Sequence, residues 1–137
     1  METIGAFSTA YPLEILIAEN DPDAQATTRE LLLDLGYSPA IAATGTEVLR
    51  MTTAQRYDVI LMDLRMPGLE KVLAEPKTTP GARPIIIAMS GIATPDIRQR
   101  SLEAMMDHSI SKPMDQNELT LQLKACAVLT GKCRIRK

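Results

Sequence analysis

The sequence predicts an α/β fold in which one parallel sheet is covered by helices on both faces. The first observation is that strand-like and helix-like segments alternate along the 137 residues, which is typical of such a fold. The second is that the run 59–62 is apolar on both faces, as a strand in the middle of a parallel sheet is, and that further strand-like runs occur at 13–18 and 84–89. A hydrophobic content of 45% and a net charge of −2 fit one compact domain with a single core.

The first strand is expected over residues 13–18 and is followed by a helix. Asp21 is placed to cap this helix, with Pro22 at its first position, because proline is preorganised for the first helical turn. The helix is expected to stop at Gly36. Its buried stripe is expected to consist of three leucines: Leu31, Leu32 and Leu35.

The second strand is expected over residues 37–42, which include Pro39. Since proline cannot donate a ladder hydrogen bond, this strand is expected at an edge of the sheet. A second helix is expected over residues 46–55. The apolar run 59–62 then predicts a central strand that ends in Asp63.

The third helix is predicted to be short or irregular. Only residues 68–74 have helical character before prolines and a Thr-Thr pair interrupt the chain over 76–81. A further strand is expected over 84–89, and it leads into Ser90 and Gly91.

The last part of the chain continues the alternation of helices and strands. A fourth helix is expected over residues 94–106, followed by a weaker strand over 108–111 that leads into Lys112. Residues 115–118 have the sequence Asp-Gln-Asn-Glu, which predicts a capping box at the start of the last helix. This helix is expected to end at Gly131.

Polar side chains follow four of the predicted strands. In chain order they are Glu19, Asn20 and Asp21, then Asp63, then Ser90, and finally Lys112. Because the carboxyl ends of parallel strands meet at the same edge of a sheet, we expect these side chains in one crevice. Carboxylates at close quarters repel each other and need a cation, and Mg²⁺ is the natural one for oxygen ligands. An aspartate beside Mg²⁺ and an ammonium group is equipped to accept a phosphoryl group, and the hydroxyl and the amine are then able to bind its oxygens.

Four segments of the chain carry a resemblance to a known family: residues 15–22, 57–67, 84–90 and 101–113. These segments occur in the order, and near the spacing, that is found in the receiver domains of two-component signalling. The chain therefore resembles this family. The resemblance extends from about residue 13 to residue 130. It implies a flavodoxin-like, doubly wound sheet of five parallel strands in the order 2-1-3-4-5, with helices on both faces.

The resemblance also implies a role for each polar residue. Asp63 would be the phosphoacceptor and would take a phosphoryl group from a histidine of a partner histidine kinase or histidine phosphotransfer protein. Ser90 and Lys112 would bind the phosphoryl oxygens. A Mg²⁺ ion would be held by four groups: Glu19, Asn20, Asp63 and the backbone carbonyl of Arg65. The chain would then be a signalling domain and not an enzyme, apart from the chemistry of its own phosphorylation.

Three departures from the family bear on this function. Asn20 stands where the family has a second acid, so Mg²⁺ is expected to bind weakly. Two roles are open for Asp21: a small shift would bring it to the metal, or it serves only as the helix cap. Ser109 stands where the family usually has a Tyr or Phe that turns inward on activation, and the loop after Pro67 lacks a few residues that the family usually inserts.

The two ends of the chain are expected to lie outside the receiver domain, which is predicted over 13–130. Residues 1–12 are expected to be a flexible lead-in and residues 131–137 a basic tail. No run approaches the length of a membrane span and the N-terminus lacks the order of a signal peptide, so a cytoplasmic location is expected. The net charge of −2 gives no nucleic-acid footprint. Cys126 and Cys133 are expected to be ordinary thiols.

Two other classes of function stay open. A pseudo-receiver would keep the fold and act as a protein-interaction module without phosphorylation, which Asn20, Ser109 and the short third helix favour. A flavodoxin or an aspartyl phosphotransferase would use a similar fold. However, the acidic segment 19–22 does not suit a flavin phosphate, and Arg65 stands where a phosphatase would need a second aspartate. The receiver itself is expected either to stand alone or to be the terminal receiver of a hybrid histidine kinase.

Overall fold

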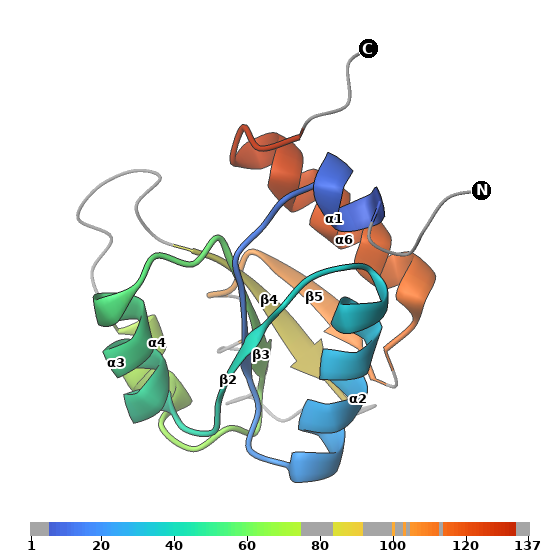
Figure 1. The fold of residues 1–137 in the computed structure, drawn as a ribbon. Coiled ribbons are helices and arrows are strands. Elements are labelled where there is room, and N and C mark those ends of the chain that lie inside the picture. Colours follow the sequence, from blue (N-terminus) through green and yellow to red (C-terminus); the bar gives the residue numbers. More distant parts are fainter. Residues whose placement is uncertain are drawn as a thin grey trace.

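The computed structural model describes residues 6–74, 84–91, 100, 103, 105–112 and 114–133. They form a five-stranded parallel sheet with the strand order β2-β1-β3-β4-β5. The strands are β1 (Ile15–Ala18), β2 (Ala40–Ala42), β3 (Val59–Asp63), β4 (Ile85–Ser90) and β5 (His108–Ser111). The helices are α1 (Ala6–Ala10), α2 (Pro22–Asp34), α3 (Gly45–Ala54), α4 (Leu69–Leu73) and α6 (Gln116–Leu129). The predicted doubly wound α/β fold is therefore confirmed (Figure 1), and no described helix is long and apolar enough to cross a membrane.

Helices cover both faces of the sheet, as Figure 1 shows: α3 and α4 lie on one face, and α2 and α6 on the other. The side chains of β1 alternate between these two layers, since successive residues of a strand point to opposite faces. Leu16 and Ala18 pack in the same core cluster as Val48 of α3, whereas Ile15 and Ile17 belong to the cluster with α2 and α6. All residues of β3 are buried, which agrees with its predicted central position.

Two helices begin at the capping residues that the local sequence favours. Asp21 Oδ2 accepts a hydrogen bond from Ala24 N at 2.8 Å, so α2 begins with Asp21 as its cap and Pro22 in its first turn, as predicted. Asp115 Oδ2 accepts from Glu118 N at 3.2 Å in the same way at the start of α6. Each cap stabilises its helix by about 1 kcal/mol, because it satisfies an N–H group that has no partner within the helix.

Other expected elements differ in their bounds or lie outside the described residues. β2 begins at Ala40 rather than at residue 37, because Pro39 has no N–H to donate and the ladder with β1 begins after it. The shortness of α4 confirms the short third helix predicted from the sequence. The helix predicted over 94–106 lies largely outside the described residues, and so does Pro113.

The segment that precedes β1 contains the short helix α1, which packs against the rest of the domain. The centroid of the Phe7 ring lies 4.9 Å from that of Tyr11 and 6.1 Å from that of Tyr37. Ser8 N donates a hydrogen bond to Leu35 O at 3.0 Å, and the Tyr37 hydroxyl donates to Tyr11 O. Three of the four aromatic side chains of the chain thus pack together here, while the flexible lead-in expected over residues 1–12 stays a prediction.

Lys132, which follows α6, forms an ion pair with the buried side chain of Asp58. Its Nζ lies 2.8 Å from Asp58 Oδ2, and its backbone N donates to Ala127 O at 2.8 Å. Asp58 is 4% exposed, and its Oδ2 also accepts a hydrogen bond from Glu14 N at 2.8 Å. The beginning of the predicted basic tail is thus anchored beside the start of β3, while residues 134–137 lie outside the described residues.

Replacing Lys132 by Met is expected to destabilise the fold, because the buried Asp58 carboxylate loses a charged hydrogen-bond donor. Since the Lys132 side chain is 42% exposed, solvent screens the pair, and we expect the free energy of unfolding to fall by about 1–2 kcal/mol. Denaturant unfolding of both proteins measures this loss. Lys71→Met, at an exposed lysine of α4, is the matched control and should change the free energy by about 0.5 kcal/mol or less. Equal stabilities of the wild type and Lys132→Met would contradict a stabilising ion pair.

Candidate functional site

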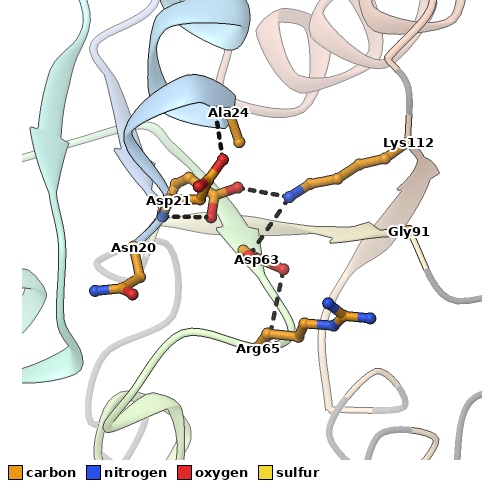
Figure 2. A pocket seen from close by; sticks show the side chains of 8 residues that line it. Asn20, Asp21, Ala24, Asp63, Arg65, Gly91 and Lys112 are labelled. Atoms are coloured by element: carbon orange, nitrogen blue, oxygen red, sulfur yellow. Dashed lines mark hydrogen bonds and ion pairs between the residues drawn. The ribbon is translucent and has the colours of Figure 1, made fainter.

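A cavity of about 360 Å³ opens at the carboxyl ends of the strands, where parallel α/β sheets place their ligand sites. It is lined by eight residues: Glu19, Asn20, Asp21, Ala24, Asp63, Arg65, Gly91 and Lys112. These residues come from the ends of β1, β3, β4 and β5, from the loops that follow them and from the first turn of α2 (Figure 2). Segments that are far apart in the sequence therefore meet in one site.

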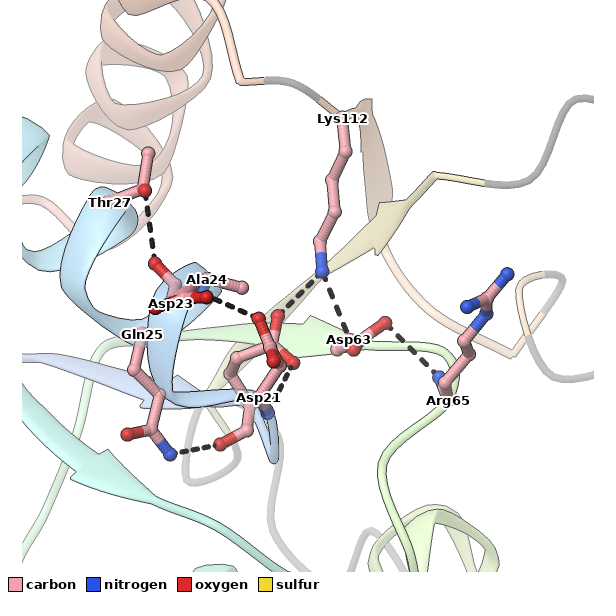
Figure 3. Close-up of polar contacts among 9 residues, drawn as sticks. Asp21, Asp23, Ala24, Gln25, Thr27, Asp63, Arg65 and Lys112 are labelled. Atoms are coloured by element: carbon pink, nitrogen blue, oxygen red, sulfur yellow. Dashed lines mark hydrogen bonds and ion pairs between the residues drawn. The ribbon is translucent and has the colours of Figure 1, made fainter.

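Lys112 bridges two carboxylates in this cavity. Its Nζ lies 2.6 Å from Glu19 Oε1 and 3.4 Å from Asp63 Oδ2. Figure 3 shows the ammonium group between the acidic side chains. The two acids lie at the ends of the paired strands β1 and β3, and Lys112 comes from the end of β5. One positive charge is thus shared by two negative ones.

Glu19 is the most deeply buried member of the site, with a fully buried side chain. Its Oε2 accepts a hydrogen bond from Asp21 N at 3.2 Å, while Oε1 faces Lys112. Burial raises the pKa of Glu19, because a carboxylate loses solvation there, and the neighbouring Asp63 raises it further, against the opposing effect of Lys112. Even with Lys112 in contact, the ionised form of Glu19 is therefore less favourable than that of an ordinary glutamate, and a further cation would favour it.

Asp63 ends β3 and is 7% exposed. Its Oδ1 accepts a hydrogen bond from Arg65 N at 3.2 Å, and its backbone O accepts from Met66 N at 3.1 Å. These two bonds close the turn after β3. The bond from Arg65 N also fixes the Asp63 carboxylate at the cavity wall, with Oδ2 directed to Lys112.

Six of the seven site residues predicted from the sequence line the cavity, and Ser90 is the exception. Ser90 is the last residue of β4, and its carbonyl O accepts a hydrogen bond from Lys112 N at 2.8 Å. Its backbone therefore lies next to the site. The roles of the seven residues in phosphoryl and metal binding stay predictions.

Asn20 and Asp21 are both hydrogen-bonded to the backbone. Asn20 Nδ2 donates to Ala43 O at 3.3 Å, and in Figure 2 its amide points away from Lys112 and Asp63. Asp21 caps α2, so of the two roles that the sequence leaves open for it, the hydrogen bonding supports the cap. Both residues still line the cavity.

Two contacts of Glu19 could not be found by sequence reasoning. The sequence predicts Lys112 at the phosphoryl oxygens, whereas the structure pairs it most closely with Glu19. The only signal for this pair is that both residues lie at strand ends on the same edge of the sheet. Gln25 Nε2 donates to Glu19 O and ties α2 to the end of β1 (Figure 3), a contact that no sequence motif marks.

The two acids fit a hydrated divalent cation rather than a closed metal cage. Within the described part of the chain, no three His, Cys, Asp or Glu side chains are grouped so that they could hold a metal. Mg²⁺ does not need such a group, because it keeps several waters and uses one or two carboxylates. Glu19 and Asp63 supply two, and because Lys112 balances only one of their charges, a further cation would be favourable.

A comparison with known protein families matches residues 15–124 to the response regulator receiver domain. The chain is 33% identical to the gliding motility regulatory protein of Myxococcus xanthus in an alignment of 122 residues that covers 87% of this chain and 15% of that protein. It is 31% identical to the transcriptional regulatory protein PrrA of Mycobacterium tuberculosis, over 81% of this chain and 48% of that protein. The chain therefore belongs to the response regulator receiver domain family, and it spans less than half the length of these two relatives.

Solved structures of receiver domains share this fold. The receiver domain of a sensor histidine kinase from Pseudomonas aeruginosa PAO1 is 33% identical, with a TM-score of 0.74 over 85% of this chain and 98% of that chain. That structure has a magnesium ion coordinated in its active site cleft. The signal receiver domain of a signal transduction histidine kinase from Syntrophus aciditrophicus is 29% identical, with a TM-score of 0.71 over 91% of this chain and 96% of that chain. The resemblance inferred from the sequence is confirmed.

Replacing Asn20 by Asp is expected to tighten Mg²⁺ binding by roughly tenfold. The substitution adds a negative charge at the cavity and removes the amide donor that bonds to Ala43 O, so the new carboxylate is free to face the ion. Without metal, the added charge repels Glu19 and Asp63 and should slightly lower the free energy of unfolding. Titration of Mg²⁺ into both proteins, and unfolding with and without the ion, measure the two effects. Equal Mg²⁺ affinities would contradict a place for residue 20 beside the ion.

The affinity for Mg²⁺ is expected to fall as the pH is lowered from neutral through the raised pKa of Glu19. The proton and the ion compete for the Glu19 carboxylate, and the raised folded-state pKa of Glu19 lets the proton compete at a higher pH than it does at an ordinary Glu. Glu19 is mostly protonated below this raised pKa and mostly ionised above it, so the affinity for Mg²⁺ increases as the pH rises. Glu19→Gln does not titrate and should bind Mg²⁺ more weakly, with most of the pH dependence lost. A wild-type affinity that stays constant over this range would show that Glu19 does not meet the ion.

Proposed function

We propose that this domain is a phosphoacceptor of a two-component or phosphorelay system, in which Asp63 accepts a phosphoryl group from a histidine of a partner protein. The observation that carries the proposal is the place of Asp63 at the cavity wall, 3.4 Å from Lys112 Nζ and next to the buried Glu19. Membership of the receiver domain family supports it. The proposed partner is a histidine kinase or a histidine phosphotransfer protein, acting in the cytoplasm.

In the proposed reaction, a carboxylate oxygen of Asp63 attacks the phosphorus atom of a phosphohistidine. The new O–P bond forms as the N–P bond breaks, and the histidine nitrogen keeps the electron pair of the broken bond. Arg65 N holds Oδ1 of Asp63, and Oδ2 faces Lys112. We assign Lys112 and the neighbouring Ser90 to the phosphoryl oxygens, where a charged donor and a hydroxyl stabilise the transferred charge.

The same proposal includes a weakly bound Mg²⁺ ion. Glu19 and Asp63 would hold it, together with the side chain of Asn20 and the backbone carbonyl of Arg65. When bound, the ion supplies positive charge that neutralises the acids and the incoming phosphoryl group. The magnesium ion in the active site cleft of the Pseudomonas aeruginosa receiver domain supports this assignment.

The pseudo-receiver alternative is favoured by the hydrogen bond from Asn20 to Ala43 O, which turns this amide away from Asp63. In that case the domain would bind its partner without being phosphorylated. Ser109 agrees with this alternative, because it is exposed on β5 and is too small to replace an aromatic switch residue. Phosphate incorporation in the presence of Mg²⁺ distinguishes the two functions.

Asp63→Asn is expected to abolish phosphate incorporation from acetyl phosphate and Mg²⁺ while the fold stays intact, because the amide keeps the shape of the carboxylate but is not a nucleophile. Intact-protein mass spectrometry measures the incorporation. Asp23→Asn, which changes an exposed acid in the first turn of α2, is the control and should still gain one phosphate. A phosphorylated Asp63→Asn protein would show that the site assignment is wrong. A wild type that gains no phosphate would contradict the proposed function.

A further inference from the structure

Two glycines from separate parts of the chain, Gly45 and Gly68, are in contact beside the candidate site. Gly45 is the first residue of α3, and Gly68 precedes α4 at the end of the loop that follows Asp63. A Cβ atom added to Gly45 would fall 2.0 Å from Gly68 O and 2.4 Å from Gly68 C. Even a methyl group does not fit there, so only glycine at position 45 permits this close approach of the two backbones.

Hydrogen bonds connect the same region to the loop after β1, which contains Glu19, and to the loop after β3, which follows Asp63. Gly45 N donates to Pro67 O at 2.8 Å, in the loop after β3. Ala43 O accepts from Asn20 Nδ2 at 3.3 Å, in the loop after β1. We call residues 43–45 the α3 bracket, because this segment contacts both loops.

The α3 bracket is itself fixed by the cap of α3. Thr44 Oγ1 accepts a hydrogen bond from Glu47 N at 3.2 Å. Glu47 Oε1 in turn accepts from Ala43 N, in the residue before the cap, so the two side chains close the start of α3 in a variant of the capping box. Because these hydrogen bonds fix the start of α3, the α3 bracket can hold the loop after β3 in place.

We propose that Gly45 is a positioning residue for the candidate phosphoryl-transfer site, because its missing side chain lets the α3 bracket hold the loop 64–68 in the position that presents Asp63. This inference rests on the proposed function. The loop is short, and its other end is tied to Asp63 Oδ1 by Arg65 N at 3.2 Å, at the long end of the range for such bonds. Because few residues separate Gly68 from Asp63, a displacement of Gly68 is expected to move the Asp63 carboxylate as well.

The size of the effect follows from the space at Gly45. A Cβ atom at 2.0 Å from a backbone oxygen must move by about 1 Å to reach a tolerable distance, and either the loop or the start of α3 has to give way. A misplacement of about 1 Å at a reacting group can slow a reaction by about a hundredfold. Because Asp63 lies at the far end of the loop, we expect a loss of about tenfold.

Gly45→Ala is expected to lower the rate of phosphate incorporation from acetyl phosphate and the affinity for Mg²⁺, each by about tenfold. It should also shift the amide resonances of Leu64 and Arg65. Val48→Ala removes buried volume from the same helix without adding an atom at the α3 bracket, so it controls for lost stability. At a temperature at which all variants are folded, Val48→Ala should keep the wild-type rate, affinity and resonances at these two positions.

Gly68→Ala changes the other residue of the Gly45–Gly68 contact. If Gly45→Ala does not fold, this second variant tests whether the contact positions the loop. Gly68 has φ +79°, and an added Cβ would lie 3.2 Å from Gly45 N. Gly131 has φ +74° and no atom within 4 Å of an added Cβ. Gly68→Ala and Gly131→Ala thus bring similar backbone strain, but only the first adds a contact at the α3 bracket. We expect a severalfold loss of rate and affinity for Gly68→Ala and none for Gly131→Ala.

The resonances of Leu64 and Arg65 separate this inference from the proposed function. If the wild type is not phosphorylated, the proposed function fails, and shifts at these two amides still show whether Gly45 positions the loop. Wild-type resonances and Mg²⁺ affinity in a folded Gly45→Ala protein would overturn the inference. If that variant is unfolded, equal resonances at Leu64 and Arg65 in Gly68→Ala and Gly131→Ala would overturn it.

Discussion

Lys112 holds together two carboxylates that would otherwise repel each other, and the rest of the site depends on this interaction. Glu19 is fully buried and Asp63 nearly so, and buried carboxylates are strongly unfavourable without a partner. The Lys112 ammonium contacts both, at 2.6 Å and 3.4 Å, yet its single charge balances only one of them. Burial, and after it the neighbouring Asp63, raises the pKa of Glu19, and the charge that Lys112 leaves uncompensated explains why the cavity would favour a further cation.

The parallel sheet sets the distances of this interaction. β1 and β3 are hydrogen-bonded neighbours, so Glu19, which follows β1, and Asp63, which ends β3, are brought close. Lys112 is fixed at the end of β5 by its bond to Ser90 O. In the structure Lys112 lies closer to Glu19 than to Asp63. Binding of phosphoryl oxygens would require Lys112 to move its main contact toward Asp63.

The fold could be predicted largely from the sequence, because its signals are local. The buried run before Asp63 marks the central strand, and the capping residues Asp21 and Asp115 mark the starts of two helices. The contacts at the chain ends could not be predicted in this way. The packing of Phe7 on Tyr37 and the ion pair of Lys132 with Asp58 join residues that no periodicity relates.

The site was predictable in composition but not in side-chain direction. Strand ends converge in any parallel sheet, so the residues that end or follow the strands were expected in one cavity. Whether Asn20 faces Asp63 or Ala43 O depends on the loops after β1 and β2, whose conformations the sequence does not specify. The close contact of Gly45 with the loop after β3 could not be predicted for the same reason, since it depends on how this loop folds against the start of α3.

The most direct test of a metal-dependent phosphoacceptor site is a crystal structure of this domain with Mg²⁺ and beryllofluoride, which mimics a phosphoryl group. We predict that beryllium is bonded to a carboxylate oxygen of Asp63 and that Mg²⁺ lies beside Glu19 and Asp63. Lys112 Nζ should then contact the beryllofluoride rather than Glu19. A structure at saturating concentrations in which Asp63 is unmodified, no ion is bound and Lys112 still contacts Glu19 would contradict a phosphoacceptor function.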